Sequence, residues 1–410
     1  MYADIVVIGG GASGIAAAIS AKKACPPAKI VIAERLDKVG RKILSTGNGR
    51  CNLSNQSILP EHYHGSVRNI MKIIEKTPSA EEFFSDMGIL CRADEQGRIY
   101  PRSMSAATVL SALRMRLSEL DIAEICGFEL VSIEKKKSYE VVSLNGDRIS
   151  CRKIVIAAGG YAAPQFGTDG SVMRIFRERG YKTAKICPSV APLRVSPESV
   201  KGLKGVRAKG CAAAFSGGKK LKEEFGEIQF TENSLSGICV FNLARFFQQY
   251  EGGLTLQIDF APDMTLQQIT DYLNIVKKQR AERSIDELLT GFFVKNLAVF
   301  IVRKAISRSL SDKIYTLTKE DITDIAWKIK NFQFSITGSS PWKNAQVTAG
   351  GIHGDCVDDR LESKLDRGIF FCGEILDADG DCGGFNLQWA WSSGLWAGQN
   401  CAESLRGERL

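Results

Sequence analysis

One segment near the N-terminus, DIVVIGGGASGIAAAISAKKA, constrains the fold more than any other part of the chain. An apolar stretch runs into a turn whose glycines, Gly9, Gly11 and Gly14, have the spacing GxGxxG. The first glycine allows a tight turn, the second lets a pyrophosphate approach the backbone, and the third lets the helix pack closely on the strand. The free amides of Ala12 and Ser13 at the helix start favour phosphate. The segment predicts a dinucleotide-binding strand–turn–helix unit.

A carboxylate stands where such a unit needs one. A second predicted strand, KIVIAER, ends at Glu34, twenty residues after Gly14. A carboxylate at this position can accept hydrogen bonds from both hydroxyls of a ribose, and it disfavours a 2′-phosphate. The nucleotide is therefore predicted to be of the FAD or NAD type. The adjacent residue, Arg35, is a cation, so a nucleotide with a 2′-phosphate stays an alternative. Arg35 is included among the predicted contacts.

The segment DKVGRKILSTGNGRCNLSN comes next, and its content of Gly, Asn, Ser and Thr predicts a loop. Arg41, Lys42 and Arg50 bring positive charge to the region of the expected pyrophosphate, and Asn48 adds a polar side chain. Two interpretations stay open. The segment is either an ordinary surface loop or a donor-rich wall beside a cofactor ring.

The remainder of the first 186 residues predicts alternating helices and strands. Ser79 and Glu82 have the spacing of a helical capping box. Further helices are predicted to begin near Ser105 and at Asp169. An Asn145–Gly146 pair within alternating apolar residues is typical of a hairpin turn, and the resulting β-meander ends in the apolar strand IVIAAGG.

The pattern of apolar and polar residues changes twice after that strand. Residues 187–262 and 331–345 alternate like strands and predict an inserted β domain, whereas residues 263–330 have helical periodicity and predict an inserted helical domain. We expect residues 1–186 and 346–410 to form the two parts of the nucleotide-binding domain. The predicted fold class is α/β, a Rossmann-like domain with insertions.

Composition excludes several classes of protein. The chain has 410 residues and a net charge of +8, which fits an anionic ligand without a dense basic stripe for nucleic acid. Twelve cysteines without CxxC pairs, and an N-terminus without a signal sequence, predict a reduced cytoplasmic protein. Three histidines make a metal site unexpected. Residues 382–402 carry no formal charge, but their glycines and amides predict a buried helix, not a membrane span.

Near the C-terminus, GEILDADGDCGGFNLQWAWSSG places Asp377, Asp379 and Asp381 at alternate positions. An EF-hand loop would require glycine at its sixth position and glutamate at its twelfth. Counting from the first aspartate, those positions hold Cys382 and Gln388. A calcium loop is excluded, and the three tryptophans of the region are predicted to lie in the core, at Trp389, Trp391 and Trp396.

Several motifs together carry a family resemblance. They are the GxGxxG turn with its following acid, GRKILSTGNGRCNLSN, GRIYPRS, IVIAAGG, QVTAGGI and the C-terminal segment. The chain resembles the BaiN and aminoacetone-oxidase-like flavoproteins over nearly its whole length. The resemblance implies a two-dinucleotide FAD-binding domain with an inserted β-barrel-like domain and an inserted helical domain. Members differ in substrate: one reduces an unsaturated keto-steroid bile acid, and another oxidises a small aminoketone.

The resemblance also assigns the C-terminal segment to the flavin. Gly373 and Glu374 would follow a late strand and bind the ribityl chain. The next helix would point its first amides at flavin N1, where Gly383 and Gly384 let the ring approach, and Asp379 would cap a turn or touch ribityl and phosphate groups. The predicted FAD contacts are Gly9, Gly11, Ala12, Ser13, Gly14, Glu34, Arg35, Arg41, Lys42, Asn48, Val131, Ala158, Gly159, Gly160, Gly373, Glu374, Asp379, Gly383, Gly384, Phe385, Asn386 and Leu387.

The leading functional hypothesis is an FAD-dependent oxidoreductase that reduces a conjugated C=C bond of a small apolar, steroid- or bile-acid-like carbonyl compound. NAD(P)H is a possible transient donor, although no second GxGxxG provides a separate site. The alternatives are an amine oxidase of small aminoketones that produces peroxide, and a non-catalytic flavoprotein that binds RNA or a protein partner.

Catalytic side chains are less well defined by the sequence. Tyr100, Tyr161 and Arg50 are candidates because their motifs are expected near the flavin ring. The competing interpretation makes the two tyrosines packed turn residues and the arginine a loop or phosphate anchor. Cys51 lies in the same loop, but without a CxxC partner a redox disulfide is rejected.

Overall fold

The computed structural model describes residues 1–250 and 253–406. The chain divides into two compact units, each considered by itself. The first consists of Met1–Pro188 and Trp342–Leu410, and the second is Ser189–Pro341. The predicted α/β class and the predicted β-barrel-like and helical insertions are confirmed.

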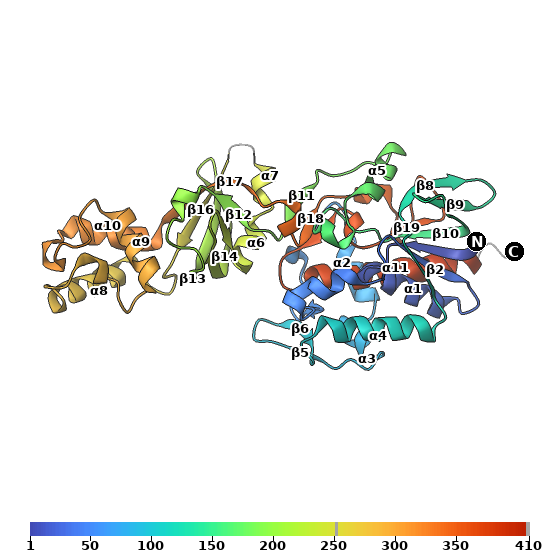
Figure 1. The fold of residues 1–410 in the computed structure, drawn as a ribbon, viewed down its shortest axis with the longest axis horizontal. Coiled ribbons are helices and arrows are strands. Elements are labelled where there is room, and N and C mark those ends of the chain that lie inside the picture. The colour runs from blue at the N-terminus through green and yellow to red at the C-terminus, as the bar shows by residue number, and fades with distance from the viewer. Residues whose placement is uncertain (251–252, 407–410) are drawn as a thin grey trace. The chain divides into compact units, whose positions relative to one another are not determined.

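A seven-stranded sheet forms the centre of the first unit (Figure 1). Four neighbouring strands, in the order β2-β1-β10-β19, run parallel. β7 extends the parallel part beyond β2, whereas β8 and β9 form the antiparallel meander next to β10. The strands are β1 (Tyr2–Ile8), β2 (Ile30–Glu34), β7 (Ala123–Cys126), β8 (Leu130–Lys135), β9 (Tyr139–Ser143), β10 (Arg148–Ile156) and β19 (Ile369–Phe371).

Two helices from opposite ends of the sequence, α1 (Ala12–Ala24) and α11 (Phe385–Arg406), pack against each other beside this sheet (Figure 1). Their backbones approach closely because Gly394 and Gly398 of α11 lie against the carbonyl oxygens of Ser13 and Ala17, where a Cβ atom would collide. Two of the three predicted core tryptophans of α11 are fully buried, and the third, Trp396, is only partly buried. Among the described residues, no helix is long and apolar enough to cross a membrane.

The predicted loop after β2 is in part a helix. A 3-10 helix spans Arg41–Gly49, with a kink at Thr46, Gly47 and Asn48. The prediction of an irregular loop was wrong here, because Gly, Asn and Ser content does not distinguish an irregular loop from a short helix with i→i+3 hydrogen bonds. The segment packs on α4 (Ala106–Glu119), where Gly40 lies against Leu110.

Small elements complete the first unit. The predicted capping box of Ser79 and Glu82 is present at the start of α3. Three small sheets pair β3 with β6 and β6 with β5, β4 with β20, and β11 with β18. The bounds are α2 (Ile70–Lys76), α3 (Ala80–Ser85), α5 (Ser171–Glu178), β3 (Ser54–Asn55), β4 (Tyr63–Gly65), β5 (Cys91–Ala93), β6 (Arg98–Pro101), β11 (Cys187–Ser189), β18 (Val347–Ala349) and β20 (Ala378–Gly380).

A closed barrel of six antiparallel strands forms one part of the second unit. Its strand order is β12-β15-β14-β13-β16-β17, and β12 pairs with β17 to close the ring. Phe230, Phe260 and Phe334 are among the buried aromatic side chains that fill it. The strands are β12 (Leu193–Val195), β13 (Arg207–Ser216), β14 (Lys219–Phe230), β15 (Ser234–Ser236), β16 (Leu254–Asp259) and β17 (Phe332–Ser339).

The helical part of the second unit contains α8 (Leu266–Gln279), α9 (Lys295–Ala305) and α10 (Lys319–Lys330). Capping boxes begin α8 and α10. The helical pattern predicted from Ile285 onward breaks at Gly291, which has a φ of +94°, so that only α9 is a full helix there. Two short helices, α6 (Ile238–Leu243) and α7 (Phe246–Gln249), accompany the barrel.

Candidate functional site

The predicted cofactor segments follow four neighbouring parallel strands of the central sheet. In register, Ile8 of β1 lies beside Ala33 of β2 and Ile156 of β10, and Ile156 lies beside Phe371 of β19. These strands therefore end at one edge of the sheet. The glycine turn, the acid at the end of β2, the glycine pair after β10 and the Gly-Glu pair after β19 all follow these ends. Open α/β sheets bind nucleotides at this edge.

The glycine turn has the geometry of a phosphate-binding loop. Gly9 has a φ of +101°, and a Cβ atom there would lie 2.5 Å from the Ala157 carbonyl oxygen. A Cβ atom on Gly14 would collide with the Gly9 carbonyl oxygen, whereas one on Gly11 would meet open space. Gly11 is the N-cap of α1, and no side chain caps this helix. The uncapped helix start can therefore bind an anion with its backbone amides.

The carboxylate after β2 is fixed in place by backbone amides. Glu34 Oε2 accepts a hydrogen bond from Gly10 N at 2.6 Å, and Oε1 accepts one from Leu36 N at 2.8 Å. Each carboxylate oxygen has a second lone pair, so this carboxylate keeps acceptor capacity for ribose hydroxyls.

Arg35, by contrast, is held by two carboxylates, Asp169 at 2.8 Å and Glu129 at 3.2 Å. Burial opposes ionisation of Asp169, but hydrogen bonds from Ser171 and Arg35 outweigh it and lower the pKa of Asp169 to about 2. The charge of Arg35 is thus balanced within the chain, which disfavours its use for a 2′-phosphate. Val131, a predicted contact nearby in sequence, is exposed and lies at a register shift between β8 and β9.

An ion pair ties the 3-10 helix to the segment after β19. Lys42 Nζ lies 2.9 Å from Glu374 Oε2 and also donates to the Ala162 carbonyl oxygen at 3.2 Å. Glu374 Oε1 accepts from Thr348 N at 2.7 Å. Thr348 Oγ1 in turn accepts from the amides of Tyr161 and Ala162 at 2.8 and 3.0 Å. Four segments that are distant in sequence therefore meet in one hydrogen-bonded network.

The front and back ends of the chain touch directly at this network. Gly373 has a φ of +74°, and a Cβ atom there would collide with the side chain of Ser13 in the first turn of α1. Its amide donates to Ser393 Oγ at 2.9 Å. Gly159, with a φ of +72°, and Gly160 lie against Thr168 and Thr348, and the neighbouring Ala158 is partly buried. Side chains are thus excluded where the loops cross.

A second backbone cradle precedes α11. Gly383 and Gly384 have φ values of +138° and +104°, and a Cβ atom on Gly384 would collide with the Ser54 carbonyl oxygen. Asn55 Nδ2 donates to the Gly383 carbonyl oxygen at 2.9 Å. Beside this cradle, Oδ1 of Asn52 is buried without a hydrogen-bond partner among the described residues. A buried unpaired acceptor indicates a missing donor, and the sequence reasoning had passed over this residue although it lies in the GRCNLSN motif.

The remaining predicted contacts around α11 are engaged within the chain. Asn386 spans the preceding turn, since its Oδ1 accepts from Gly380 N at 2.8 Å and its Nδ2 donates to Gly380 O at 2.7 Å. Phe385 stacks on His62 at 4.2 Å between ring centroids, and Leu387 is partly buried against the core. At the 3-10 helix, Arg41 is exposed and pairs with Asp37, and Asn48 has a φ of +54°.

The alternating aspartates take separate structural positions. Asp377 accepts from Ser66 N at 2.9 Å, and Asp379, 1% exposed, pairs with His64 in the β20–β4 ladder. Asp381 is 5% exposed. Its Oδ1 lies 2.9 Å from His64 Nε2, and its Oδ2 lies 3.3 Å from His62 Nδ1. Turn chemistry alone does not describe them, because two imidazoles from a segment distant in sequence share the last carboxylate.

The three catalytic candidates fall into two groups. Arg50 lies over the ring of Tyr100 at 5.2 Å, and Tyr100 is 3% exposed. Burial raises the pKa of Tyr100, against the opposing effects of Arg98 and Arg50. Tyr161 lies after β10, where its amide donates to Thr348 Oγ1 of β18, and its ring packs on Trp342 at 5.4 Å. Arg50 and Tyr100 are thus in contact with each other, whereas Tyr161 contacts other residues.

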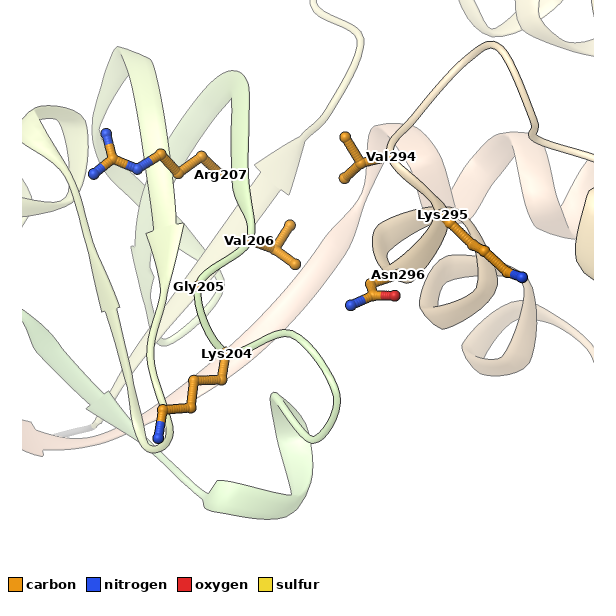
Figure 2. Close-up of a pocket in the computed structure, with 7 residues that line it drawn as sticks. All are labelled: Lys204, Gly205, Val206, Arg207, Val294, Lys295 and Asn296. Atoms are coloured by element: carbon orange, nitrogen blue, oxygen red, sulfur yellow. The ribbon is translucent and has the colours of Figure 1, made fainter.

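The second unit contains a cavity of about 560 Å³ between the start of β13 and the start of α9 (Figure 2). Although Lys204, Arg207 and Lys295 line it, their charged ends point away from the gap, and Val206 and Val294 face each other across it (Figure 2). Two of these cations pair with glutamates outside the cavity. The lining of the cavity is therefore mixed, with polar and apolar groups, and it holds no predicted site residue.

Comparison with known proteins agrees with this architecture. A family model described as HI0933-like protein Rossmann domain matches residues 3–400. The chain is 34% identical to a 3-dehydro-bile acid delta(4,6)-reductase of Clostridium scindens, covering 97% of this chain and 99% of that one. It is 24% identical to a ribosomal RNA dihydrouridine synthase of Haemophilus influenzae, over 96% of each. An Escherichia coli quinol fumarate reductase, FrdA, has the same fold at 14% identity and a TM-score of 0.53, covering 100% of this chain and 71% of that chain.

The fold and the edge of the sheet define an FAD-dependent oxidoreductase of the Rossmann type. The open space at Gly11, the uncapped α1 and the buried unpaired Oδ1 of Asn52 fit the pyrophosphate and the ring of FAD. The chain belongs to the HI0933-like family.

Proposed function

We propose that the protein reduces a C=C bond conjugated to a carbonyl group, in a steroid-like substrate. The observation that carries the proposal is the match to the Clostridium scindens bile-acid reductase, which extends over 97% of the chain and so includes both units. A 3-dehydro-delta(4) steroid presents such an enone. Bound FAD, once reduced, would supply a hydride to the β-carbon of that enone, and the α-carbon would take up a proton from solvent.

The residues of the chain would perform the remaining work. The glycine turn and α1 would bind the diphosphate, and Glu34 the adenosine ribose. The cradle at Gly383 and Gly384 would place the first amides of α11 where negative charge gathers on the reduced ring. Asn52 Oδ1 is an acceptor, and the flavin N3–H is the donor that would satisfy it.

Polarisation of the substrate carbonyl requires a hydrogen-bond donor beside the ring. Tyr100 supplies the best candidate, because burial keeps its hydroxyl protonated and the Arg50 cation lies over its ring. A hydroxyl donor would stabilise the charge that develops on the carbonyl oxygen during hydride transfer. Tyr161, whose backbone amide donates to Thr348 Oγ1, is the alternative donor.

NAD(P)H is proposed as a transient electron donor. The 410-residue sequence has a single GxGxxG, at the turn already assigned to FAD. A nicotinamide would therefore have to approach the same face of the ring as the substrate, and the two would compete. Steady-state kinetics should then follow a ping-pong pattern, in which NAD(P)H and the substrate bind in turn at one site.

The direct test uses reduced protein mixed without oxygen with a panel of 4-ene-3-ketosteroids. We expect reoxidation of the flavin at about 450 nm, the absorbance of the oxidised cofactor. A saturated 3-ketosteroid is the matched control, since it has the carbonyl but no conjugated bond. A flavin that stays reduced with every enone would contradict the proposal. Oxygen consumption with aminoketones would instead favour the oxidase hypothesis.

A second candidate substrate is the uracil ring of RNA. The Haemophilus influenzae relative is named as a ribosomal RNA dihydrouridine synthase, and the C5=C6 bond of uridine is conjugated to a carbonyl, so the same electron flow would reduce it. The net charge of +8 fits an anionic polymer. Incubation of the reduced protein with unmodified ribosomal RNA, followed by a dihydrouridine assay, separates this substrate from the steroid.

A further inference from the structure

A cluster of two histidines around one buried aspartate lies next to the start of α11. His64 Nε2 is 2.9 Å from Asp381 Oδ1, and His62 Nδ1 is 3.3 Å from Asp381 Oδ2. The aspartate is buried, and the imidazoles are about one-quarter exposed. One carboxylate is thus shared between two bases, which gives the cluster a net charge of −1, 0 or +1 according to whether none, one or both imidazoles are protonated.

The cluster is joined to the flavin cradle through covalent and packing contacts. Asp381 stands two positions before Gly383 in the sequence. The ring of His62 stacks on Phe385, the first residue of α11, at 4.2 Å and an interplanar angle of 21°. Tyr63, between the two histidines, donates to the Phe385 carbonyl oxygen at 3.3 Å. A change of charge at the imidazoles therefore occurs beside the helix start that is proposed to bind the ring.

Strand pairing does not require this cluster. β4 and β20 already pair through their backbones, with Asp379 opposite His64 and Gly380 opposite Tyr63. The amide of Asp381 additionally donates to the His62 carbonyl oxygen at 2.9 Å. The imidazole–carboxylate contacts are therefore additional to the backbone hydrogen bonds of the ladder.

We propose that His62, His64 and Asp381 form a proton-binding group that couples proton uptake by the chain to reduction of the bound flavin. The inference rests on the flavin position given under the proposed function. Two electrons and one proton convert oxidised FAD to the anionic reduced form, with dithionite or NAD(P)H as the electron source. The new negative charge favours protonation of an imidazole, so that a second proton is taken up from solvent.

The coupling is reciprocal by linkage. If reduction of the flavin makes an imidazole easier to protonate, protonation makes the flavin easier to reduce by the same factor. When the cluster is neutral, the helix dipole alone balances the negative charge of the reduced ring. When the cluster is cationic, it adds a full charge of opposite sign. The first amides of α11 and the imidazoles would thus act on the same developing charge.

Three further acids lie near the cluster in the ladder or along the chain. Asp379 is opposite His64 in the ladder, Asp377 is held by the amide of Ser66, and Glu61 precedes His62. All three side chains end in carboxylates. Imidazole is the side chain whose ordinary pKa lies in the physiological range, so the histidines are the responsive members.

The remaining titratable neighbours do not change charge in that range. Burial raises the pKa of Tyr63 well above its usual value. Burial raises the pKa of Cys382 to about 11, with Arg98 opposing and Asp381 adding to the effect. Arg98 itself pairs with Asp94 at 2.7 Å. Both hydroxyl and thiol stay neutral, and the cation is balanced.

The experiment is a potentiometric titration of the flavin in the holoprotein from about pH 5.5 to about 8.5, a range around the ordinary imidazole pKa. For a two-electron couple, a tenfold change corresponds to about 30 mV. Each additional proton taken up therefore steepens the dependence of the potential on pH by about 30 mV per pH unit. The wild type should show this extra slope.

The variant is His62→Asn with His64→Gln, because the side-chain amides can replace the Nδ1 and Nε2 contacts without titrating. It should lose the extra slope and approach the wild-type potential at high pH. The matched control is His353→Asn, which changes the third and last histidine of the sequence, paired with Asp355 outside this cluster. The control should keep the wild-type curve. Coincident curves for the wild type and the double variant would overturn the inference.

A second measurement needs no variant. The three histidines of the sequence allow separate ring resonances to be followed in the wild-type holoprotein by nuclear magnetic resonance. Reduction of the flavin should raise the titration midpoints of two rings and leave that of His353 unchanged. Three unmoved midpoints would overturn the inference. Protein that binds no FAD would contradict the proposed function instead, so the two failures are distinguishable.

Discussion

Two glycine-rich turns open two helices that pack on each other, yet their surroundings differ. The turn before α1 is bordered by fixed charges: Glu34 is held by two backbone amides, and Arg35 is held by Asp169 and Glu129. The turn before α11 is bordered by a shared carboxylate, Asp381, and two imidazoles. A diphosphate keeps its charge throughout a redox cycle, whereas a flavin ring does not. On the proposed placement of FAD, the diphosphate would meet fixed charges and the flavin ring would meet groups that can respond to its change of charge.

The largest expected effect comes from a substitution in the turn before α1, where one glycine is needed for packing and another for binding of FAD. Gly14→Ala places a Cβ atom on the Gly9 carbonyl oxygen, where backbone must move. We expect destabilisation by about 1–3 kcal/mol, as for overpacked cores, together with loss of FAD. Thermal unfolding and absorbance at about 450 nm measure both effects.

Gly11→Ala is the control for that variant, because its Cβ atom enters open space. The cofactor-free protein should unfold like the wild type, while FAD binding weakens by roughly tenfold, which corresponds to about 1.4 kcal/mol. Equal damage to folding in both variants would contradict the distinction between the two glycines.

The next effect concerns the ion pair that connects the two halves of the site. Glu374→Gln leaves Lys42, whose side chain is 24% exposed, without its carboxylate. Breaking a fully buried pair costs about 3–5 kcal/mol, and the partial exposure here reduces the expected loss to about 1–2 kcal/mol. Urea unfolding measures it. The double variant Lys42→Met with Glu374→Gln should recover part of the loss, and absence of any recovery would argue against direct coupling of the two side chains.

Asn52 provides a smaller and more selective test at the α11 turn. Its Oδ1 has no partner in the described part of the chain, so Asn52→Ala should leave the stability of the cofactor-free protein nearly unchanged. Loss of one hydrogen bond to the ring should weaken FAD binding by about 0.5–1.5 kcal/mol. Asn55→Ala is the comparison, since Asn55 already donates to Gly383 and its loss should destabilise the cofactor-free protein as well. Unchanged FAD affinity in Asn52→Ala would remove this residue from the site.

These two turns were not equally accessible from the sequence. The α1 turn is local, because the spacing of Gly9, Gly11 and Gly14 and the acid twenty residues later contain the whole pattern. The central sheet, the meander and the inserted barrel followed from periodicity and from the family resemblance. The 3-10 helix at Arg41–Gly49 did not, because residues typical of loops also form short helices.

The surroundings of the α11 turn depend on pairs that are far apart in the chain. His64 and Asp381 are separated by 317 positions, and Lys42 and Glu374 by 332. A single sequence contains no signal for such pairs. Of the two histidines only His64 lies in β4, and the carboxylate that both contact could be found only once β4 was paired with β20.

The smallest expected effect tests whether the charges near α1 are indeed unresponsive. The folded pKa of Asp169 is lowered to about 2 by hydrogen bonds from Ser171 and Arg35, which outweigh burial. Its contribution to stability is therefore present above the unfolded value of about 4 and is lost as the pH falls toward 2. Because the side chain is 38% exposed, solvent screening limits the contribution to about 1 kcal/mol or less.

Asp169→Asn should accordingly be less stable than the wild type by a constant amount between about pH 5 and about pH 8, and the gap should narrow as the pH falls below the ordinary carboxylate pKa of about 4. Urea unfolding of both proteins as a function of pH measures the gap. If the gap instead changed across the neutral range, the charges beside α1 would respond where those beside α11 are expected to, and the contrast between a constant and a responsive end of the site would fail.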